Sequence, residues 1–180
     1  MERIARFEKV SESRWLQDYT ELFGKNGPEG TAGQKNLEEE ALRAYGEIRL
    51  PRRATAGSAG YDLCTPVDIR LEPGQSMKIP TGIRVRMRQD YCLLIVPRSG
   101  LGSKFRFQLN NTAGVIDSDY YYSDNEGHIF VPMINDSRDG RVVELKKGTA
   151  FAQSLFVSYG ITEDDDTETV RNGGFGSTGT

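Results

Sequence analysis

The sequence predicts an all-β domain, a sandwich or barrel of the jelly-roll kind, preceded by an extension of different character. Two observations predict this class: short β-forming runs follow one another from residue 47 onward, and turn-forming clusters separate them. The clusters Glu72-Pro73-Gly74-Gln75 and Ser137-Arg138-Asp139-Gly140 combine glycine with proline or aspartate, which favour tight turns. Many short strands joined by regular turns are typical of jelly rolls.

Residues 1–46 are predicted to form a β/α extension. Residues 4–10 can form a strand, and residues 11–23 are helix-like, with Ser11 as N-cap and Gly24 at the end. Residues 26–34 form a polar, glycine-rich connection, and residues 36–45 are a second helical stretch. One helical stripe is apolar, and we expect it to pack against the β domain or a neighbouring subunit; its residues are Trp15, Leu16, Tyr19, Leu22 and Phe23.

The β domain is predicted to span residues 47–160. Ile83, Val85 and Met87 alternate with arginines, which is the period of a half-buried strand. Residues 92–96 are a continuous apolar run ended by Pro97, which favours a strand buried on both faces. Further strands are expected at residues 67–71, 76–79, 128–134, 141–145 and 150–157.

Composition excludes several classes of function. The net charge is −3 and the isoelectric point about 5.3, so nothing favours a nucleic-acid-binding surface. No apolar run approaches the length of about 18 residues that a membrane span needs, and no signal peptide is recognised, so we expect a cytoplasmic protein. Cys64 and Cys92 have no paired spacing and are interpreted as small buried hydrophobes in a reducing compartment.

The single histidine, His128, narrows the chemistry further. It excludes His-rich zinc sites and any Ser-His-Asp triad that does not use His128 itself. Alternation in the run Gly-His-Ile-Phe-Val predicts that His128 faces outward from a strand. The chemistry must therefore rely on carboxylates, arginines, hydroxyls and backbone amides.

Two segments suit a phosphorylated ligand. Arg98-Ser99-Gly100 leaves a predicted strand and offers a guanidinium, a hydroxyl and a permissive backbone within one turn. Residues 171–180 hold four glycines, Arg171 and Phe175, which suit phosphate oxygens and a flat ring, although a frayed tail is the plain alternative. Neither segment is a Walker loop, because GxxxxGK[ST] does not occur.

A third segment combines a turn with a carboxylate. Residues 111–114 are turn-rich, Val115 and Ile116 are β-forming, and Asp117 follows at once. Such a hairpin can present backbone groups to the edge of a base, with Asp117 as general base for a water. Asp119 shares the face of Asp117 by alternation, so a metal-binding pair is the competing interpretation, and an ordinary solvated turn is the simplest one.

Five segments, taken in order, resemble the motifs of the trimeric all-β dUTPases, which are deoxyuridine 5′-triphosphate nucleotidohydrolases. The resemblance covers residues 48–180, and its most specific parts are Gly-Val-Ile-Asp-Ser-Asp-Tyr from Gly114 and Gly-Gly-Phe-Gly-Ser-Thr-Gly from Gly173. It implies a jelly-roll-like β-barrel and a homotrimer with active sites at the subunit interfaces. It also implies Mg²⁺-dependent hydrolysis of dUTP to dUMP and pyrophosphate, by water attack on the α-phosphorus, which keeps uracil out of DNA and supplies dUMP for dTMP synthesis.

The resemblance assigns roles by position around the reacting atoms. Asp117 matches the carboxylate that deprotonates the water, and Ser99 lies near the bridging oxygen of the leaving group. Asp62 matches an aspartate that holds the phosphate–metal water network without ligating the metal directly, so Mg²⁺ is expected to ride on the triphosphate. The remaining phosphate contacts implied are Arg98, Ser99, Gly100 and Gln153.

Base and sugar selection are implied for the third motif. Asn111 and the backbone of Gly114, Val115 and Ile116 match the hairpin that reads uracil, and Tyr120 matches the ring that packs under deoxyribose. Residues 161–180 match an arm that closes over the site of a neighbouring subunit. In this arm Arg171 would meet the γ-phosphate, Phe175 would stack on uracil, and phosphate donors would come from Gly176, Ser177 and Thr178.

The chain departs from the family pattern at three places. Residues 121–126 intervene between Tyr120 and Gly127, where the family reaches a glycine two residues after the tyrosine. Ala150 stands where the fourth motif usually has an arginine, so one positive contact near the phosphates is missing. Arg171 stands four residues before Phe175 rather than the usual five.

Two other functions compete with dUTP hydrolysis. A dCTP deaminase or bifunctional enzyme of the same fold would rely on a glutamate in the hairpin, where this chain has Asp117, and would lack the C-terminal arm. A non-catalytic interaction protein would use residues 1–46 and 121–126 as partner surfaces, and a regulatory protein partner is the expectation that goes with it.

Overall fold

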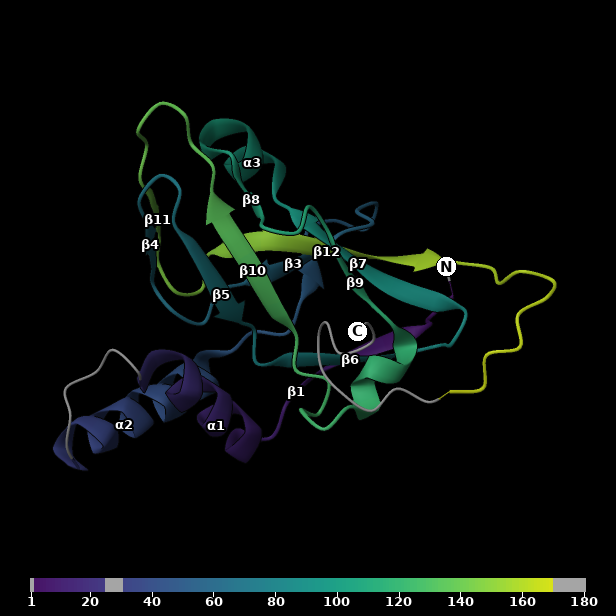
Figure 1. Ribbon diagram of the computed structural model, residues 1–180, viewed down its shortest axis with the longest axis horizontal. Helices are drawn as coiled ribbons and strands as arrows, with labels where there is room; N and C mark the ends of the chain where they lie inside the picture. Colours follow the sequence, from purple (N-terminus) through teal and green to yellow (C-terminus); the bar gives the residue numbers. More distant parts are fainter. Residues whose placement is uncertain (1, 25–30, 170–180) are drawn as a thin grey trace.

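The computed structural model describes residues 2–24 and 31–169 of the chain (Figure 1). Its first elements are β1 (Ala5–Lys9), α1 (Glu12–Phe23), α2 (Thr31–Glu47), β2 (Arg52–Arg53), β3 (Tyr61–Cys64), β4 (Ile69–Leu71), β5 (Ser76–Pro80), β6 (Ile83–Met87) and β7 (Tyr91–Pro97). They are followed by α3 (Ser99–Phe105), β8 (Phe107–Leu109), β9 (Gly114–Ile116), η2 (Ser118–Tyr122), β10 (Phe130–Asn135), β11 (Val143–Leu145) and β12 (Ala150–Ser158).

Within the described residues the strands form four hydrogen-bonded sheets. The largest has the order β2-β3-β12-β7-β9, a second has the order β5-β10-β8, and two pairs are β1-β6 and β11-β4. All of these pairings are antiparallel. Strand neighbours come from distant parts of the chain, as in a jelly roll, and Figure 1 shows α1 and α2 together at one side of the strands. The predicted class, a β-rich body with an N-terminal β/α extension, is confirmed.

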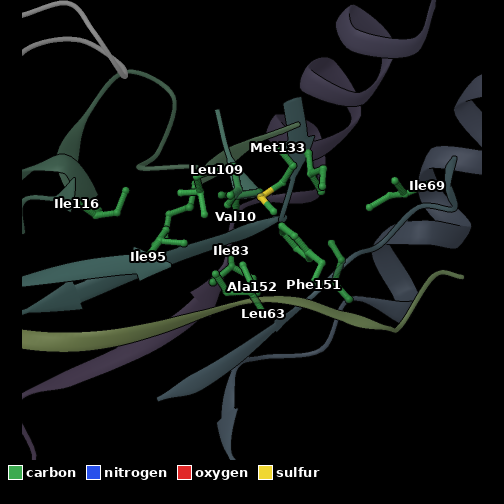
Figure 2. Packing of buried hydrophobic residues seen from close by; sticks show 14 of the residues in the cluster. Val10, Leu63, Ile69, Ile83, Ile95, Leu109, Ile116, Met133, Phe151 and Ala152 are labelled. Carbon is green, nitrogen blue, oxygen red and sulfur yellow. The ribbon is translucent and has the colours of Figure 1, made fainter. Parts of the chain in front are cut away.

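The core lies where the sheets face one another. Figure 2 shows Leu63, Ile83, Ile95, Met133 and Phe151 converging from five different strands, each at most 1% exposed. Burying one such side chain contributes about 1.5–3 kcal/mol. The core therefore ties the separate sheets into one body and fixes the strand faces that carry the polar site.

Strand β6 follows its predicted alternation, whereas β7 does not follow its predicted burial. Ile83, Val85 and Met87 of β6 are buried. In β7, Leu93 and Ile95 are buried, but the intervening Leu94 and Val96 are only half-buried. The expectation of a strand buried on both faces is therefore wrong for the described part of the chain, in which no element fully covers the outer face of β7.

The N-terminal extension packs on the turn between β5 and β6. The backbone N–H of Arg14 donates to the hydroxyl of Ser11, as expected for an N-cap, at 3.1 Å. Trp15 is fully buried, and its indole Nε1–H donates to the carbonyl of Ala41 at 2.7 Å. Gly82 lies beneath it with φ +68°, and a Cβ there would come within 3.2 Å of the Trp15 ring. The apolar stripe thus packs against the β domain.

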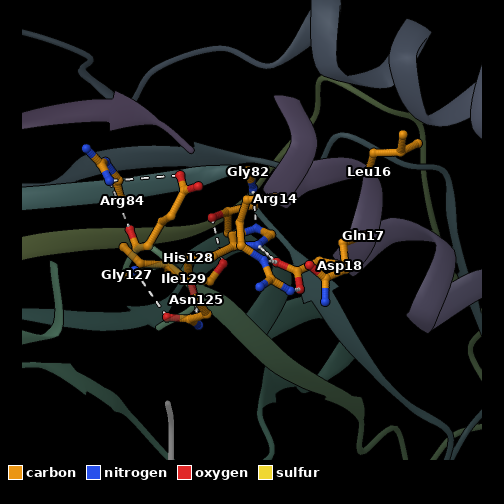
Figure 3. A network of polar contacts seen from close by, with 12 residues as sticks. Arg14, Leu16, Gln17, Asp18, Gly82, Arg84, Asn125, Gly127, His128 and Ile129 are labelled. Atoms are coloured by element: carbon orange, nitrogen blue, oxygen red, sulfur yellow. Dashed lines mark hydrogen bonds and ion pairs between the residues drawn. The ribbon is translucent and has the colours of Figure 1, made fainter. Parts of the chain in front are cut away.

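His128 contradicts its predicted outward orientation. It precedes β10, its side chain is fully buried, and its ring contacts Trp15 and Phe130. The backbone N–H of Gly82 donates to Nε2 at 2.8 Å, so Nε2 carries no proton, and Nδ1–H donates to Asp18 Oδ2 at 2.6 Å (Figure 3). Alternation failed because residues 127–129 connect η2 to β10 and are not part of the strand.

Arg14, Asp18 and His128 form the junction between α1 and the strands, and hydrogen bonds balance the charge within it. Burial lowers the pKa of His128, although the neighbouring Asp18 carboxylate opposes part of that shift. Burial raises the pKa of Asp18, but the hydrogen bonds from His128 and Arg14 outweigh it and leave that pKa below its usual value. Arg14 Nε donates to Asp18 Oδ2 at 3.0 Å. The helix pair is therefore held to the strands by a neutral histidine and an ionised carboxylate.

Candidate functional site

The C-terminal end of β7 presents a hydroxyl, a glycine and a guanidinium to solvent. Arg98 follows the strand in an extended conformation and is the N-cap of α3 (Ser99–Phe105). Ser99 and Gly100 are exposed in the first turn of that helix. The sequence analysis expected these residues in a turn after a strand; the structure continues them into a short helix.

Beside this end, three strands place polar side chains in one row. Gln153 of β12 lies opposite Asp62 of β3, and the same Asp62 lies opposite Arg52 of β2. Directly opposed residues of antiparallel strands share a face, so these three side chains are neighbours on the outer face of the sheet. Arg98 Nε approaches Asp62 Oδ1 at 3.5 Å, which joins the row to the start of α3.

Gln153 also explains Gly60, in the segment Ala59-Gly60-Tyr61-Asp62-Leu63 that resembles the first dUTPase motif. Its amide nitrogen donates to the carbonyl of Pro97 at 3.5 Å. A Cβ on Gly60 would lie 2.7 Å from its side-chain oxygen, so a larger residue at position 60 would push the amide away. The structure thus places Arg98, Asp62 and Gln153 next to one another, with Ser99 and Gly100 directly after Arg98.

The third motif crosses between two sheets. β8 lies at the edge of the three-stranded sheet and β9 at the edge of the five-stranded sheet. The turn between them, with Asn111 exposed, includes Thr112 at φ +74°. Gly114 and Ile116 face the core, and Val115 is 52% exposed. The predicted hairpin is therefore a connection whose two strands pair with β10 and β7.

Asp117 lies at the opposite end of β7 from Arg98. Ile116 is paired with Leu93, so Asp117 is level with Cys92, whereas Arg98 follows the other end of the strand. Six residues of strand at about 3.3 Å each separate the two levels by about 20 Å. Figure 1 shows α3 and the green turn of η2 at these two ends. One chain therefore does not bring Asp117 to Ser99.

Tyr120 is enclosed within its own chain. It lies in η2, is 1% exposed, and its hydroxyl donates to the carbonyl of His128 at 2.9 Å. Asn125 Nδ2 donates to the same hydroxyl at 2.8 Å. Of its neighbours, Tyr122 is 73% exposed. The packing of Tyr120 under a sugar stays a prediction.

Comparison with known proteins agrees with this pattern of motifs. A family model described as dUTPase matches residues 46–179. The chain belongs to the dUTPase family.

Individual relatives extend the comparison over most of their own length. The deoxyuridine 5′-triphosphate nucleotidohydrolase of Lactococcus lactis is 38% identical over 135 residues, 73% of this chain and 89% of that protein. The protein of the same name from Tolumonas auensis is 39% identical over 155 residues, 81% of this chain and 98% of that protein. The crystal structure of a dUTPase from Streptococcus mutans matches with a TM-score of 0.59 and 36% identity, covering 65% of this chain and 91% of that one.

The insertion at residues 121–126 contacts the N-terminal extension. Glu126, in the insertion at residues 121–126, accepts hydrogen bonds from the backbone N–H and the hydroxyl of Ser11 at 2.8 and 2.6 Å. Tyr121 donates its hydroxyl to Glu8 Oε2 at 2.7 Å, and Arg84 donates to the same tyrosine oxygen at 2.5 Å. The insertion and the N-terminal extension therefore form one contiguous addition to the dUTPase body.

The expected arm residues lie outside the part of the chain that the structure describes, whereas the expected metal can be compared with the residues inside it. Those arm residues are Arg171, Phe175, Gly176, Ser177 and Thr178. Among the described residues, no group of three or more histidines, cysteines, aspartates or glutamates could hold a metal ion, and no helix is long and apolar enough to cross a membrane. The row supplies the single carboxylate of Asp62, which fits a hydrated Mg²⁺ carried by phosphates better than a protein cage.

Arg52 is a member of the row that the sequence motifs do not indicate. Its place opposite Asp62 follows from the pairing of β2, a strand of only two residues, with β3. The available signal was the arginine-rich run Arg49-Leu50-Pro51-Arg52-Arg53, which precedes the first dUTPase motif in the sequence.

Proposed function

We propose that the chain hydrolyses dUTP to dUMP and pyrophosphate as a homotrimer, with each active site shared between subunits. The observation that carries this proposal is the separation along β7. The phosphate-binding group around Arg98 and the candidate base Asp117 lie at opposite ends of the strand. Two chains must therefore meet before a water held by Asp117 can reach a phosphate held at Arg98 and Ser99.

Asp117 is the general base of the proposed reaction. It follows β9 directly and is half-buried, so a rigid edge strand fixes its position while water can still reach it. Its carboxylate takes a proton from the water as the oxygen attacks the α-phosphorus. The bond from the α-phosphorus to the bridging oxygen breaks, and pyrophosphate leaves.

The leaving group is bound at the row on β3, β12 and the start of α3. Arg98 and Gly100 bind phosphate oxygens, and the Ser99 hydroxyl donates to the bridging oxygen as its charge grows. Gln153 and Asp62 orient this end of the nucleotide, with Asp62 acting through water. Bound Mg²⁺ would neutralise phosphate charge and keep its waters towards Asp62.

Selection of deoxyuridine is assigned to the third motif. The backbone of Gly114, Val115 and Ile116, with Asn111, reads the uracil edge, and Tyr120 closes the sugar pocket against a 2′-hydroxyl. A base that leaves these donors and acceptors unpaired is rejected more strongly than a base that merely loses one methyl contact. In the C-terminal arm, Arg171 would bind the γ-phosphate, Phe175 would cover the base, and Gly176, Ser177 and Thr178 would supply phosphate donors.

The decisive experiment measures pyrophosphate release from dUTP, dTTP, dCTP and UTP with Mg²⁺, for the unchanged protein and for Asp117→Asn. We expect release from dUTP alone, and loss of that release in Asp117→Asn with nucleotide binding retained. Full activity in the variant would refute the assignment of the base. Failure of the unchanged protein to release pyrophosphate from any of the four nucleotides would refute the proposed function.

A further inference from the structure

A basic pocket borders the row of Asp62 and Gln153. Its volume is about 560 Å³, and its polar lining consists of Arg49, Arg52, Arg53, Asp62 and Cys64, which together we call the arginine pocket. Because Asp62 belongs both to this pocket and to the row, the pocket opens beside the proposed phosphate site. None of its three arginines belongs to a motif that the sequence analysis singled out.

Arg52 is fixed next to Asp62 by strand pairing. It lies opposite Asp62, which in turn lies opposite Gln153, so all three side chains share the outer face of the sheet. Arg52 is exposed, and no ion pair of Arg52 with a carboxylate occurs among the described residues. Its guanidinium is therefore available to a ligand that reaches Asp62.

Arg49 lies beside the position where the dUTPase pattern has an arginine and this chain has Ala150. Its guanidinium is 3.8–3.9 Å from the place that a Cβ on Gly148 would occupy, two residues before Ala150. Ala150 is the strand partner of Cys64, which lines the same pocket. Burial raises the pKa of the Cys64 thiol, and the charges of both Arg49 and Arg98 oppose that shift, as expected if both guanidinium groups surround it.

Arg53 differs from these two arginines. Its guanidinium donates to the carbonyls of Ala56 at 2.8 Å and Ser58 at 3.1 Å, so it holds the loop before β3. Asp62 is the acidic residue of the lining, and it is shared with Arg98. The pocket therefore has an excess of positive charge at a position where a polyanion is expected, and guanidinium groups bind phosphate oxygens with paired donors.

We propose that Arg49 and Arg52 bind the two terminal phosphates of the nucleoside triphosphate, and that they replace the cation missing at Ala150. This inference rests on the proposed function, because it concerns the same site. The two arginines approach the phosphate end from β2 and the segment before it, whereas the usual arginine would come from β12. They are binding residues for the leaving group and take no part in moving the proton.

The test is calorimetric titration of the full chain with a non-hydrolysable α,β-imido analogue of dUTP and, separately, with dUMP and with free pyrophosphate. We expect Arg49→Gln and Arg52→Gln each to lower the affinity for the analogue about tenfold or more, since hydrogen bonds to charged groups contribute about 1.5–3 kcal/mol. Affinity for dUMP, which lacks the terminal phosphates, should not change. Arg86→Gln is the matched control, because Arg86 is also an exposed strand arginine but lies on β6.

Three outcomes would overturn the inference. Equal binding of the analogue by the unchanged protein and both variants would remove the arginines from the site. Parallel loss of dUMP affinity in variants whose thermal unfolding is unchanged would show that the arginines do not act through the terminal phosphates. Weaker binding of free pyrophosphate without weaker binding of the analogue would make the pocket an anion site separate from the nucleotide. Failure of the unchanged protein to bind the analogue would refute the proposed function itself.

Discussion

One open and one buried cluster of this chain each join an aspartate to a nitrogen-bearing side chain, and the two differ mainly in burial. In the row on the outer sheet face, Arg98 and Asp62 are 44% and 30% exposed and lie 3.5 Å apart. In the junction beneath α1, the side chains of His128 and Asp18 are 0% and 7% exposed and lie 2.6 Å apart. The open pair leaves donors and acceptors for a ligand, whereas the buried pair uses them to hold the N-terminal extension. An aspartate thus holds two elements together in the buried cluster, whereas in the open cluster it stays accessible to solvent.

The largest effect should come from dividing the open site between chains. Ser99→Ala and Asp117→Asn should each lower turnover by about 10²–10⁴-fold, because each removes a group that acts in the transition state. When the two variants are unfolded together and refolded, random mixing should restore about a quarter of the sites, in which one chain supplies Ser99 and another supplies Asp117. Activity is measured before and after mixing. No recovery would mean that both residues come from the same chain.

Removing the buried aspartate should lower the stability of the fold and leave turnover unchanged. Asp18→Ala leaves Arg14 and His128 without their common acceptor, which should cost about 3–5 kcal/mol of unfolding free energy. Urea unfolding provides the measurement, with pyrophosphate release under folding conditions as the second readout.

The matched variant for this comparison is Asp62→Ala. Because its ion pair is exposed, its stability should change by less than about 1 kcal/mol, while its turnover falls. A stability loss as large as that of Asp18→Ala would erase the distinction between the two clusters.

The junction should also make stability depend on pH. Both His128 and Asp18 have lowered pKa values in the folded chain, so the unfolded chain binds more protons as the pH falls. Stability should be complete above the ordinary histidine pKa of about 6.5 and decline below it, by up to about 1.4 kcal/mol per pH unit for one proton. Unfolding curves between pH 8 and 5 test this, and His128→Gln should flatten the decline. An unchanged slope in that variant would assign the pH dependence to other groups.

The smallest effect should come from the contact between the insertion and α1. Glu126→Ala removes the acceptor for the Ser11 N–H and hydroxyl. Losing a hydrogen-bond partner at a helix N-terminus costs about 1 kcal/mol of unfolding free energy. Glu144→Ala, which removes an exposed carboxylate on β11, is the control and should cost less. Equal midpoints for the two variants in urea would show that the insertion does not stabilise the helix.

The sequence predicted local structure better than long-range contacts. The alternation of β6 and the Ser11 cap depend on neighbours in the chain, and both were confirmed. The burial of His128 depends on Asp18 and Gly82, which are 110 and 46 positions away, and no periodic pattern contains that information.

The candidate site shows the same division. The motifs indicated Arg98, Asp62 and Gln153, but Arg52 joins them only through the register of a two-residue strand. The distance of Asp117 from these residues depends on the pairing of β7 with β9, which sequence reasoning did not assign.

The link between Asp18 and His128 also constrains the order in which the chain folds during synthesis. Helix α1 emerges early from the ribosome, but its polar partner is encoded 110 residues later. At about 5–20 residues per second, the helix waits about 5 to 20 s for that partner. The contact of α1 with the strands lacks this polar partner for the interval, so nascent chains halted before residue 128 should depend on chaperones more than the full chain does.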